Sequence, residues 1–480
     1  MTTTPPGPDW QSLPPPAPGS PTADLAPPTD AVLPAEVAET TAPSGPPETA
    51  GRGPTRAVLA SLILPGAPSF MRRKIVSWLL LFFGVLVPVA AVVVGFVRRD
   101  RITSLVLDTT VLLIVQIVCA LFVITRLIAV IDVINNRRPG TRKRLASFVA
   151  VLGTLVVAFP AGFSVVRADQ LTDVINDVFV TAGSSDPLAV VNTNTIDTGS
   201  EFHNILLLGG DEGPGRWALR TDTMILVSVH RDSGRIAMVS IPRNLRGLDF
   251  PEGSPMHAEF PKGFTDLTNA VYPYVYANPD IAAQYLRGDL APEAVALATG
   301  IAYSMDVTIH DYVLVNMQGF LDLIDALGGV TVTLDKRIPM PGNIPGAKYR
   351  YPDLIGPGEV NLDGTLALGY VRSRAADSDY SRMGRQRHLL EQLAAQTSGS
   401  EVLLNFPDLA RVMRDSVRTS LSTDEFAFLA DRLRSGINIQ ESVGLTPPFL
   451  NPGNPNWTDI ANLIDTLQEA IKTGVDFPFA

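Results

Sequence analysis

The segment RTDTMILVSVHRDSGRIAMVSIPRN, residues 220–244, contains two apolar runs joined by a short polar stretch. The runs, at 223–229 and 236–241, are rich in β-branched residues and have the length of ordinary strands. The stretch HRDSGR between them holds Asp, Ser and Gly, which are typical tight-turn residues. The segment therefore predicts an antiparallel hairpin.

A third apolar run, NILLLG at 204–209, precedes the hairpin and extends it to a three-stranded meander. In a meander, the end of the first strand, the start of the second and the end of the third lie at one edge of the sheet. The charged residues near these positions are Asp211, Arg220, Asp222 and Arg243. The two carboxylates suit Mg²⁺, which completes its shell with water and phosphate oxygens, and the arginines suit a diphosphate. The alternative is a surface ion-pair cluster that contributes little to stability.

A second polar cluster follows much later in the chain. The motif GYVRSR at 369–374 predicts a short strand, on which Arg372 and Arg374 point to the same face and can grip a diphosphate side by side. A helix is expected to begin near Asp379. Arg382 and Gln386, four residues apart, share one face in its first turn, where free backbone N–H groups favour phosphate. The two clusters together predict an anion-binding site.

Composition excludes several classes of protein. The 480 residues include 38 basic and 48 acidic side chains, and the net charge of -10 argues against general polyanion binding. The single cysteine, Cys119, excludes a disulfide framework. The sequence lacks the motifs of zinc proteases, zinc ribbons, α/β-hydrolases and P-loop NTPases. Residues 201–480 are instead expected to form a mixed α/β domain. Helices are also expected at 423–435, capped by Thr423, and at 457–473.

The N-terminal third predicts a membrane anchor. Residues 1–56 are rich in Pro, Ala, Thr and Ser and are expected to be a disordered tail, with a Pro-rich ligand as the alternative. The membrane region 57–167 contains three apolar segments, each near the roughly twenty residues that a helix needs to cross a bilayer. They lie at 75–97, 105–124 and 145–166. We interpret 168–200 as a linker and 201–480 as the catalytic domain.

The charges that flank the apolar segments predict the orientation. Lys and Arg cluster before the first segment and between the second and third, which places the N-terminus in the cytoplasm and the domain after residue 167 outside. Arg98, Arg99 and Arg101 in the first external loop oppose this orientation. The expected localisation is the cell membrane, with three spans and an extracytoplasmic domain.

Four stretches of the chain, in this order and spacing, resemble the LytR-CpsA-Psr family, whose members attach glycopolymers to the bacterial cell wall. They are LLLGGDE at 206–212, the segment at 220–244, YVLVNMQGFLDLIDALGGVTVTL at 312–334 and GYVRSRAADSDYSRMGRQRHLLEQL at 369–393. The resemblance implies an α-β-α domain with a mixed central sheet. Three membrane spans instead of one would be a departure from the family.

The resemblance also implies roles for individual residues. Asp211 and Asp222 match the metal-binding aspartates, and with Arg243 they form the expected catalytic set. The residues that match the diphosphate-binding groups are Arg220, Arg243, Arg372, Arg374, Asp379, Arg382 and Gln386, with Asp379 orienting the arginines. Two positions depart from the family pattern: Asn244 stands where Asp is common, and Leu267 stands where Lys commonly precedes an Ile-Asn pair.

The implied reaction moves a glycan phosphate from a polyprenyl diphosphate to a peptidoglycan hydroxyl and releases polyprenyl phosphate. Mg²⁺ is the expected cofactor, with Mn²⁺ as the alternative. The implied lipid tunnel would be lined by 313–320 and 320–327, which are equally good core sequences. Arg far outnumbers Lys, which indicates a GC-rich genome. Together with the resemblance, this composition implies an actinobacterial wall and makes an arabinogalactan-type polymer one candidate substrate.

Two other functions remain open at this point, the first because of the departures at Asn244 and Leu267, and the second because the sequence does not decide between water and sugar as the nucleophile. One is a regulatory protein that binds the lipid diphosphate without transfer, and the other is a pyrophosphatase that uses water. Expected partners are the lipid-linked glycan, peptidoglycan and the bilayer. Nucleic acid is not among them, because the domain is placed outside and no basic stripe or helix-turn-helix is present.

Overall fold

A computed structural model describes most of the chain after Ser200 and two shorter stretches before it. The described residues are 78–79, 82–97, 109–135, 200–210, 220–288, 290–342, 350–374, 378–397, 409, 416–433 and 436–477. The expected tail at 1–56 and nearly all of the linker at 168–200 lie outside these residues. The predictions for those two segments therefore stay predictions.

Three described helices precede the domain and contact one another. They are the π-helix η1 (Phe82–Leu86), α3 (Val87–Val97) and α5 (Thr109–Asn135). Within the described part of the chain, no helix has both the length and the hydropathy that crossing a bilayer requires. The three-span prediction thus gains no support from these helices, and its third segment, 145–166, lies outside the described residues.

A six-stranded mixed sheet forms the centre of the domain, in the order β10-β3-β2-β1-β4-β9. The strands are β1 (Phe202–Gly210), β2 (Thr221–His230), β3 (Arg235–Ser240), β4 (Asp311–Asn316), β9 (Val417–Thr419) and β10 (Asn438–Gly444). β1, β2 and β3 pair antiparallel, which confirms the predicted meander. β4 runs parallel to β1 and β10 parallel to β3, so the predicted mixed sheet is also confirmed.

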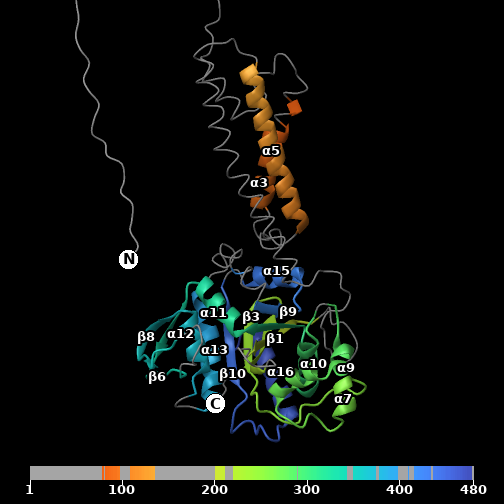
Figure 1. The fold of residues 1–480 in the computed structure, drawn as a ribbon, viewed down its shortest axis with the longest axis vertical. Coiled ribbons are helices and arrows are strands. Elements are labelled where there is room, and N and C mark those ends of the chain that lie inside the picture. The colour runs from red at the N-terminus through yellow and green to blue at the C-terminus, as the bar shows by residue number, and fades with distance from the viewer. Residues whose placement is uncertain are drawn as a thin grey trace, which may run out of the picture. The chain divides into compact units, whose positions relative to one another are not determined.

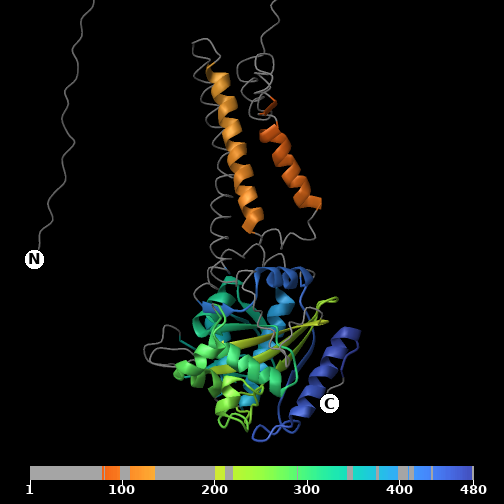
Figure 2. The ribbon, with the colours of Figure 1, turned by 90° about the vertical axis from the view of Figure 1, so that its right-hand side faces the viewer.

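Both faces of the sheet are covered, which explains the continuous apolar runs in its strands. Leu206 and Leu208 of β1 pack into one core, and the intervening Ile205 and Leu207 pack into another. The first core lies under α7 (Pro255–Glu259), η3 (Thr268–Ala270), α8 (Val271–Ala277), α9 (Pro279–Tyr285), α10 (Pro292–Ser304) and α16 (Trp457–Thr473). α15 (Thr423–Arg432) packs on the second core. Figure 2 shows α16 alongside the strands.

A third core lies beside the sheet and has its own strands. β5 (Val330–Leu334) pairs antiparallel with β8 (Gly358–Leu362), and β6 (Ile338–Pro339) with β7 (Leu354–Ile355). The helices here are α11 (Met317–Ala326), α12 (Gly364–Arg372) and α13 (Asp379–Gln396). They group with β6 and β8 on one side of the domain, and α7, α9 and α10 lie on the other (Figure 1). α13 contacts both this third core and the strands β3 and β10.

The prediction of a strand at 369–374 is wrong, because the residues from Gly364 to Arg372 form helix α12. The N-cap Asp363 accepts a hydrogen bond from the backbone N–H of Leu366 at 2.8 Å. The buried side chains of Ala367, Leu368 and Val371 follow the three- and four-residue spacing of a helix. A short apolar run fits either a strand or a buried helix, and here the cap and the packing surface favour the helix.

The two C-terminal helices have the expected positions. α16 has the predicted bounds. α15 begins at Thr423 but ends at Arg432, before the predicted residue 435, and its N-cap is Ser422 and not Thr423. The Ser422 hydroxyl accepts from the N–H of Glu425 at 3.2 Å, and the Glu425 carboxylate accepts from the N–H of Ser422 at 3.1 Å. This reciprocal pair is a capping box, which satisfies two N–H groups at once.

We predict that Asp363→Ala lowers the free energy of unfolding by about 1 kcal/mol, because it removes the side-chain cap of α12. Asp363→Asn is the matched control, since asparagine caps a helix about as well as aspartate. Urea denaturation of the purified chain, followed by circular dichroism, measures the difference. Equal stability of the alanine and asparagine variants would contradict the role of the cap.

Candidate functional site

The first polar cluster forms at the expected edge of the sheet. Asp222 is the second residue of β2, and Arg243 follows the end of β3. Arg243 Nη1 donates to Asp222 Oδ1 at 2.8 Å, so the predicted proximity of these two residues is confirmed. Both side chains are about a quarter exposed, which leaves them open to a ligand.

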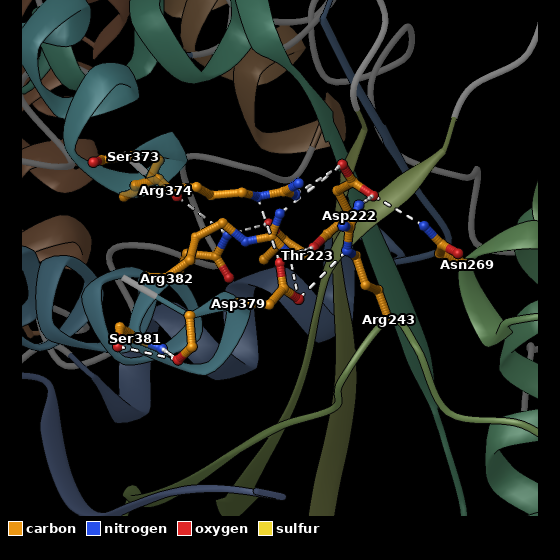
Figure 3. A network of polar contacts seen from close by, with 12 residues as sticks. Asp222, Thr223, Arg243, Asn269, Ser373, Arg374, Asp379, Ser381 and Arg382 are labelled. Atoms are coloured by element: carbon orange, nitrogen blue, oxygen red, sulfur yellow. Dashed lines mark hydrogen bonds and ion pairs between the residues drawn. The ribbon is translucent and has the colours of Figure 1, made fainter. Parts of the chain in front are cut away.

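Asp379, the first residue of α13, joins this pair to the second cluster. Its carboxylate lies 3.4 Å from Arg243 Nε, 3.5 Å from Arg374 Nε and 3.2 Å from Arg382 Nη2. Arg382 is only 3 % exposed, and its Nη2 also donates to the main-chain oxygen of Asp222 at 3.0 Å. Figure 3 shows the three arginines pointing toward the two carboxylates. A charge buried as deeply as Arg382 requires such partners.

Arg372 and Arg374 reach the site by a different route from the one predicted. Arg372 is the last residue of α12, and Arg374 follows it in the connection to α13. Arg374 Nη2 lies 3.7 Å from Asp222 Oδ2, and its side chain is 42 % exposed. Both arginines line one pocket, although they do not share the face of a strand. Arg372 and Arg374 both reach this pocket because of the direction in which the chain leaves the C-terminal end of α12.

Arg385 holds that end of α12 in place. Its Nε donates to the carbonyl of Tyr370 at 3.1 Å, and its Nη2 donates to the carbonyl of Ser373. A cation at a helix C-terminus satisfies carbonyls that have no partner within the helix. Tyr370 Oη also lies 2.9 Å from His388 Nδ1, and burial raises the pKa of Tyr370 to about 12. These contacts fix α12 against α13 and thereby set the start of the Arg374 segment.

Gln386 lies one turn further along α13 than predicted, in the second turn and not in the first. It shares a face with Arg382, as expected, and both side chains are buried. Gln386 Nε2 donates to Thr223 Oγ1 at 2.8 Å. A Cβ at Gly209 would lie 2.8 Å from Thr223 Cβ, so only glycine permits this close approach of β1 and β2. The helix is thus tied to the strand that carries Asp222.

The ion pairs also determine the charge state of Arg243. Burial lowers the pKa of this guanidinium, but the hydrogen bond from Arg243 to Asp222 and the charges of Asp222 and Asp379 outweigh burial and leave the pKa raised. Arg243 is therefore a permanent cation at the mouth of the site.

Two predicted residues are not joined to the cluster by the described contacts. Asp211 lies outside the described residues, so its role as a metal ligand stays a prediction. Arg220 directly precedes β2 and is exposed, and its carbonyl accepts from the N–H of Asp222 at 3.0 Å. Among the described residues, no ion pair links its guanidinium to Asp222 or Asp379.

A pocket of about 510 Å³ opens behind the ion-pair cluster. Its polar lining includes Asp222, Arg372, Arg374, Arg382 and Gln386. The apolar lining comes from β1, β2, β4, α11, α12 and α13 and includes Leu207, Ile225, Val313, Val315, Phe320, Leu323, Ile324, Leu368, Val371, Leu389, Leu390 and Leu393. Several members belong to the predicted lining segments 313–320 and 320–327. The pocket therefore combines a cationic mouth with an apolar interior.

The donor set at the mouth fits a hard divalent cation. Asp222 Oδ1 is occupied by hydrogen bonds, but Oδ2 has only Arg374 at 3.7 Å and Arg382 at 4.0 Å as its nearest ion-pair partners among the described residues. Asp222 Oδ2 is therefore available as a carboxylate ligand, and Mg²⁺ commonly binds through one or two such oxygens together with phosphate.

Another group of potential metal ligands, His203, Asp311 and Glu425, lies at the opposite end of β1. Arg231 Nη2 lies 3.0 Å from His203 Nδ1, and because a guanidinium can only donate, this nitrogen is an acceptor. His203 Nε2 therefore donates to Asp311 Oδ2 at 2.9 Å. Burial raises the pKa of Asp311. With both ring nitrogens occupied, we interpret this group as a structural network.

Asn269 is a contact of the site that the sequence argument did not select. Its Nδ2 donates to Asp222 Oδ1 at 2.9 Å. The sequence signal for Asn269 is its position two residues after the departure at Leu267. The pairing itself could not be foreseen, because the two residues lie 47 positions apart in sequence.

The curated proteins that resemble this chain include teichoic acid transferases. "Polyisoprenyl-teichoic acid–peptidoglycan teichoic acid transferase TagU" of Oceanobacillus iheyensis is 28% identical over 251 residues, which cover 51% of this chain and 67% of the relative. The Bacillus subtilis protein of the same name is 25% identical over 293 residues, which cover 60% of this chain and 82% of the relative. Among solved structures, B. subtilis TagT is 22% identical, with a TM-score of 0.41 and coverage of 61% of this chain and 100% of that chain.

The sequence model of the LytR-CpsA-Psr family matches residues 174–445, which is more than half of the chain. The matched range contains the whole ion-pair cluster and the described residues that line the pocket. The chain therefore belongs to the LytR-CpsA-Psr family.

Proposed function

We propose that this protein is a phosphotransferase that attaches a polyprenyl-diphosphate-linked glycopolymer to a hydroxyl of peptidoglycan. The observation that carries the proposal is the pocket, in which a cationic mouth leads into an apolar interior. A ligand that fits both parts is an amphiphile with an anionic head group and a hydrocarbon tail. The names of the TagU relatives support the same reaction class.

The head group would bind where the arginines converge. Arg243, Arg374 and Arg382 surround Asp222 and Asp379, so the described cluster carries one more positive than negative charge. A diphosphate would reverse this balance, and a divalent cation beside Asp222 would restore it. Guanidinium groups suit this head group because they present paired N–H donors to phosphate oxygens.

In the proposed reaction, the acceptor hydroxyl oxygen attacks the phosphorus that carries the glycan. The bond from this phosphorus to the bridging oxygen breaks, and polyprenyl phosphate leaves with the bonding electrons. Phosphoryl transfer depends mainly on positioning and on charge stabilisation, which the fixed arginines supply. Mg²⁺ at Asp222 Oδ2, with Asp211 as the expected second ligand, would neutralise phosphate charge. Asp222 and Asp211 are the candidate acceptors of the hydroxyl proton.

A second candidate function follows from the two departures at Asn244 and Leu267. Asn244 Oδ1 is buried and has no hydrogen-bond partner in the described part of the chain. The missing carboxylate and the missing lysine favour a protein that binds the lipid diphosphate without transfer. Hydrolysis of the same donor by water is the third outcome that an experiment must separate. The polymer itself, including an arabinogalactan-type polymer, is a proposal of the same kind.

We also propose that the domain works outside the cell, at the membrane that holds its donor. A polyprenyl chain stays in the bilayer, so an enzyme that takes its head group must act close to the lipid surface. The described helices before the domain support contact with lipid, because large apolar side chains are exposed there, among them Val93, Val94, Leu113, Ile114 and Ile117.

We predict that Arg374→Gln lowers transfer by roughly 10²- to 10³-fold, because it removes a fixed donor from the developing charge. Arg374 is partly exposed, so the substitution leaves the core intact. Arg246→Gln is the matched control: Arg246 lies on the same loop as Arg243, but its Nη1 donates to the carbonyl of Thr265. Mass spectrometry of a peptidoglycan fragment, incubated with a lipid-linked oligosaccharide and Mg²⁺, measures transfer.

Each of the three functions gives a different product in this assay. A gain in mass equal to the glycan phosphate, retained with Arg246→Gln, establishes the transferase. Bound but unchanged donor indicates a binding protein. Released glycan phosphate with unmodified acceptor indicates hydrolysis.

Removal of divalent cations is expected to stop transfer, because the cation neutralises phosphate charge beside Asp222. Dialysis against EDTA should abolish product formation, and Mg²⁺ should restore it better than Ca²⁺, which prefers longer bonds and more ligands. Asp222→Asn should remain inactive after Mg²⁺ is restored. Full activity in EDTA would contradict the proposed cofactor.

The apolar lining predicts a dependence on the length of the lipid. Leu393 lines the pocket and is half-buried, so a bound lipid tail would complete its burial. Leu393→Gln should raise KM about tenfold for a long-chain donor, because full burial of a leucine side chain contributes about 1.5–3 kcal/mol and only part of that burial remains to be gained. KM for a donor with a very short prenyl chain should change little. Leu354→Gln, on an exposed part of β7, is the control. An equal rise in KM for both donors would show that the tail does not occupy this part of the pocket.

A further inference from the structure

Asn269 contacts both partners of the shortest ion pair in the site, between Arg243 and Asp222. Its Nδ2 donates to Asp222 Oδ1 at 2.9 Å, and its backbone N–H donates to the carbonyl of Arg243 at 3.2 Å. Arg243 Nη1 in turn donates to the same Oδ1 at 2.8 Å. The three residues therefore form a closed set of contacts around one carboxylate oxygen (Figure 3).

The backbone that carries Asn269 is held firmly. It belongs to η3, the single turn of 3-10 helix at Thr268–Ala270, and Asn269 is only 1 % exposed. Thr268 donates twice to the carbonyl of Leu245, through its N–H at 2.8 Å and its hydroxyl at 3.2 Å. The amide of Asn269 is thus presented to Asp222 from a fixed position.

This arrangement separates the two oxygens of Asp222. Oδ1 accepts two hydrogen bonds, from Arg243 and Asn269, whereas the nearest cations to Oδ2 are Arg374 at 3.7 Å and Arg382 at 4.0 Å among the described residues. Oδ2 is therefore the oxygen that is left for a cation, because the two donors on Oδ1 fix the plane of the carboxylate.

We propose that Asn269 is a positioning residue, which fixes Asp222 so that Oδ2 faces the site of the divalent cation. The inference rests on the proposed function, because it assumes that a diphosphate and Mg²⁺ meet at Asp222. Hydrogen bonds from neighbouring groups orient metal-binding carboxylates in many proteins, and their loss typically lowers metal affinity or activity 10- to 100-fold.

A neutral amide suits this task better than a cation. A hydrogen bond from Asn269 orients the carboxylate without adding a further positive charge beside it. A lysine in the same position would neutralise that charge and compete with a divalent cation for the carboxylate. Asn269 Oδ1 has no hydrogen-bond partner among the described residues. The hydrogen bond to Asp222 is therefore the polar contact through which this side chain acts.

The experiment compares binding of farnesyl diphosphate to the full chain in EDTA and in Mg²⁺, by isothermal titration calorimetry. For the native chain, the ratio of the two Kd values measures how strongly Mg²⁺ tightens binding. Asn269→Leu, which has a similar volume and no donor, should reduce this ratio at least tenfold. Its Kd in EDTA should stay within about threefold of the native value, because the arginines remain in place. Asn269→Ala replaces it if the leucine variant does not fold.

Thr268→Val is the matched control, because Thr268 stabilises the same turn without contacting Asp222. It should lower the melting temperature and keep the native Mg²⁺ ratio. A native ratio in the Asn269 variants would overturn the inference and leave the proposed function standing. Equal losses in EDTA and in Mg²⁺ would also overturn it, since Asn269 would then be merely structural. A native chain that does not bind farnesyl diphosphate in either condition would contradict the proposed function itself.

Discussion

The arrangement of this site depends on the contacts made by the buried guanidinium of Arg382. A charge that is only 3 % exposed is costly without partners, and here it has Asp379 on its own helix and the main chain of Asp222 on β2. These contacts fix α13 against the central sheet. Because α13 also borders the third core, the same helix places the arginine segment and the pocket beside Asp222.

The pocket is a product of two cores that meet along α13. The sheet supplies Leu207 and Val313, and the helical side supplies Phe320, Leu368 and Leu393, so neither part encloses the space alone. The polar residues lie where the strands of the meander end and where α13 begins. An amphiphilic ligand therefore meets charge at the mouth and hydrocarbon within, which is the physical basis of the proposed lipid-linked donor.

Contacts within the protein organise the site. Asp379 holds Arg243, Arg374 and Arg382 within 3.5 Å, and Asn269 and Arg243 hold one oxygen of Asp222. Arginines that already converge need little rearrangement to receive phosphate, and such preorganisation is a main source of catalytic stabilisation. The acidic residues thus serve the arginines as much as the metal, which explains why an anion-binding site contains carboxylates at its centre.

Local sequence patterns were sufficient to predict the meander. The meander in turn was sufficient to bring Asp222 and Arg243 together, which form one half of the site. The alternation of strands and turns in residues 204–244 fixes which strand ends share an edge, so the pairing of Asp222 with Arg243 followed from the sequence. The apolar segment before Arg372 was ambiguous, because a run of nine residues suits a strand or a buried helix equally. In the structure, the cap at Asp363 and the burial of one face favour the helix.

The residue types of the site were readable from the sequence alone, since arginines, aspartates and a helix start indicate an anion-binding site wherever they lie. Their mutual geometry was not. Arg382 and Asp222 are 160 residues apart, and Asn269 reaches Asp222 across 47. Only the packing of α13 on the sheet and of η3 under the strand ends brings them together, because contacts between distant segments depend on the burial of whole faces and not on local spacing.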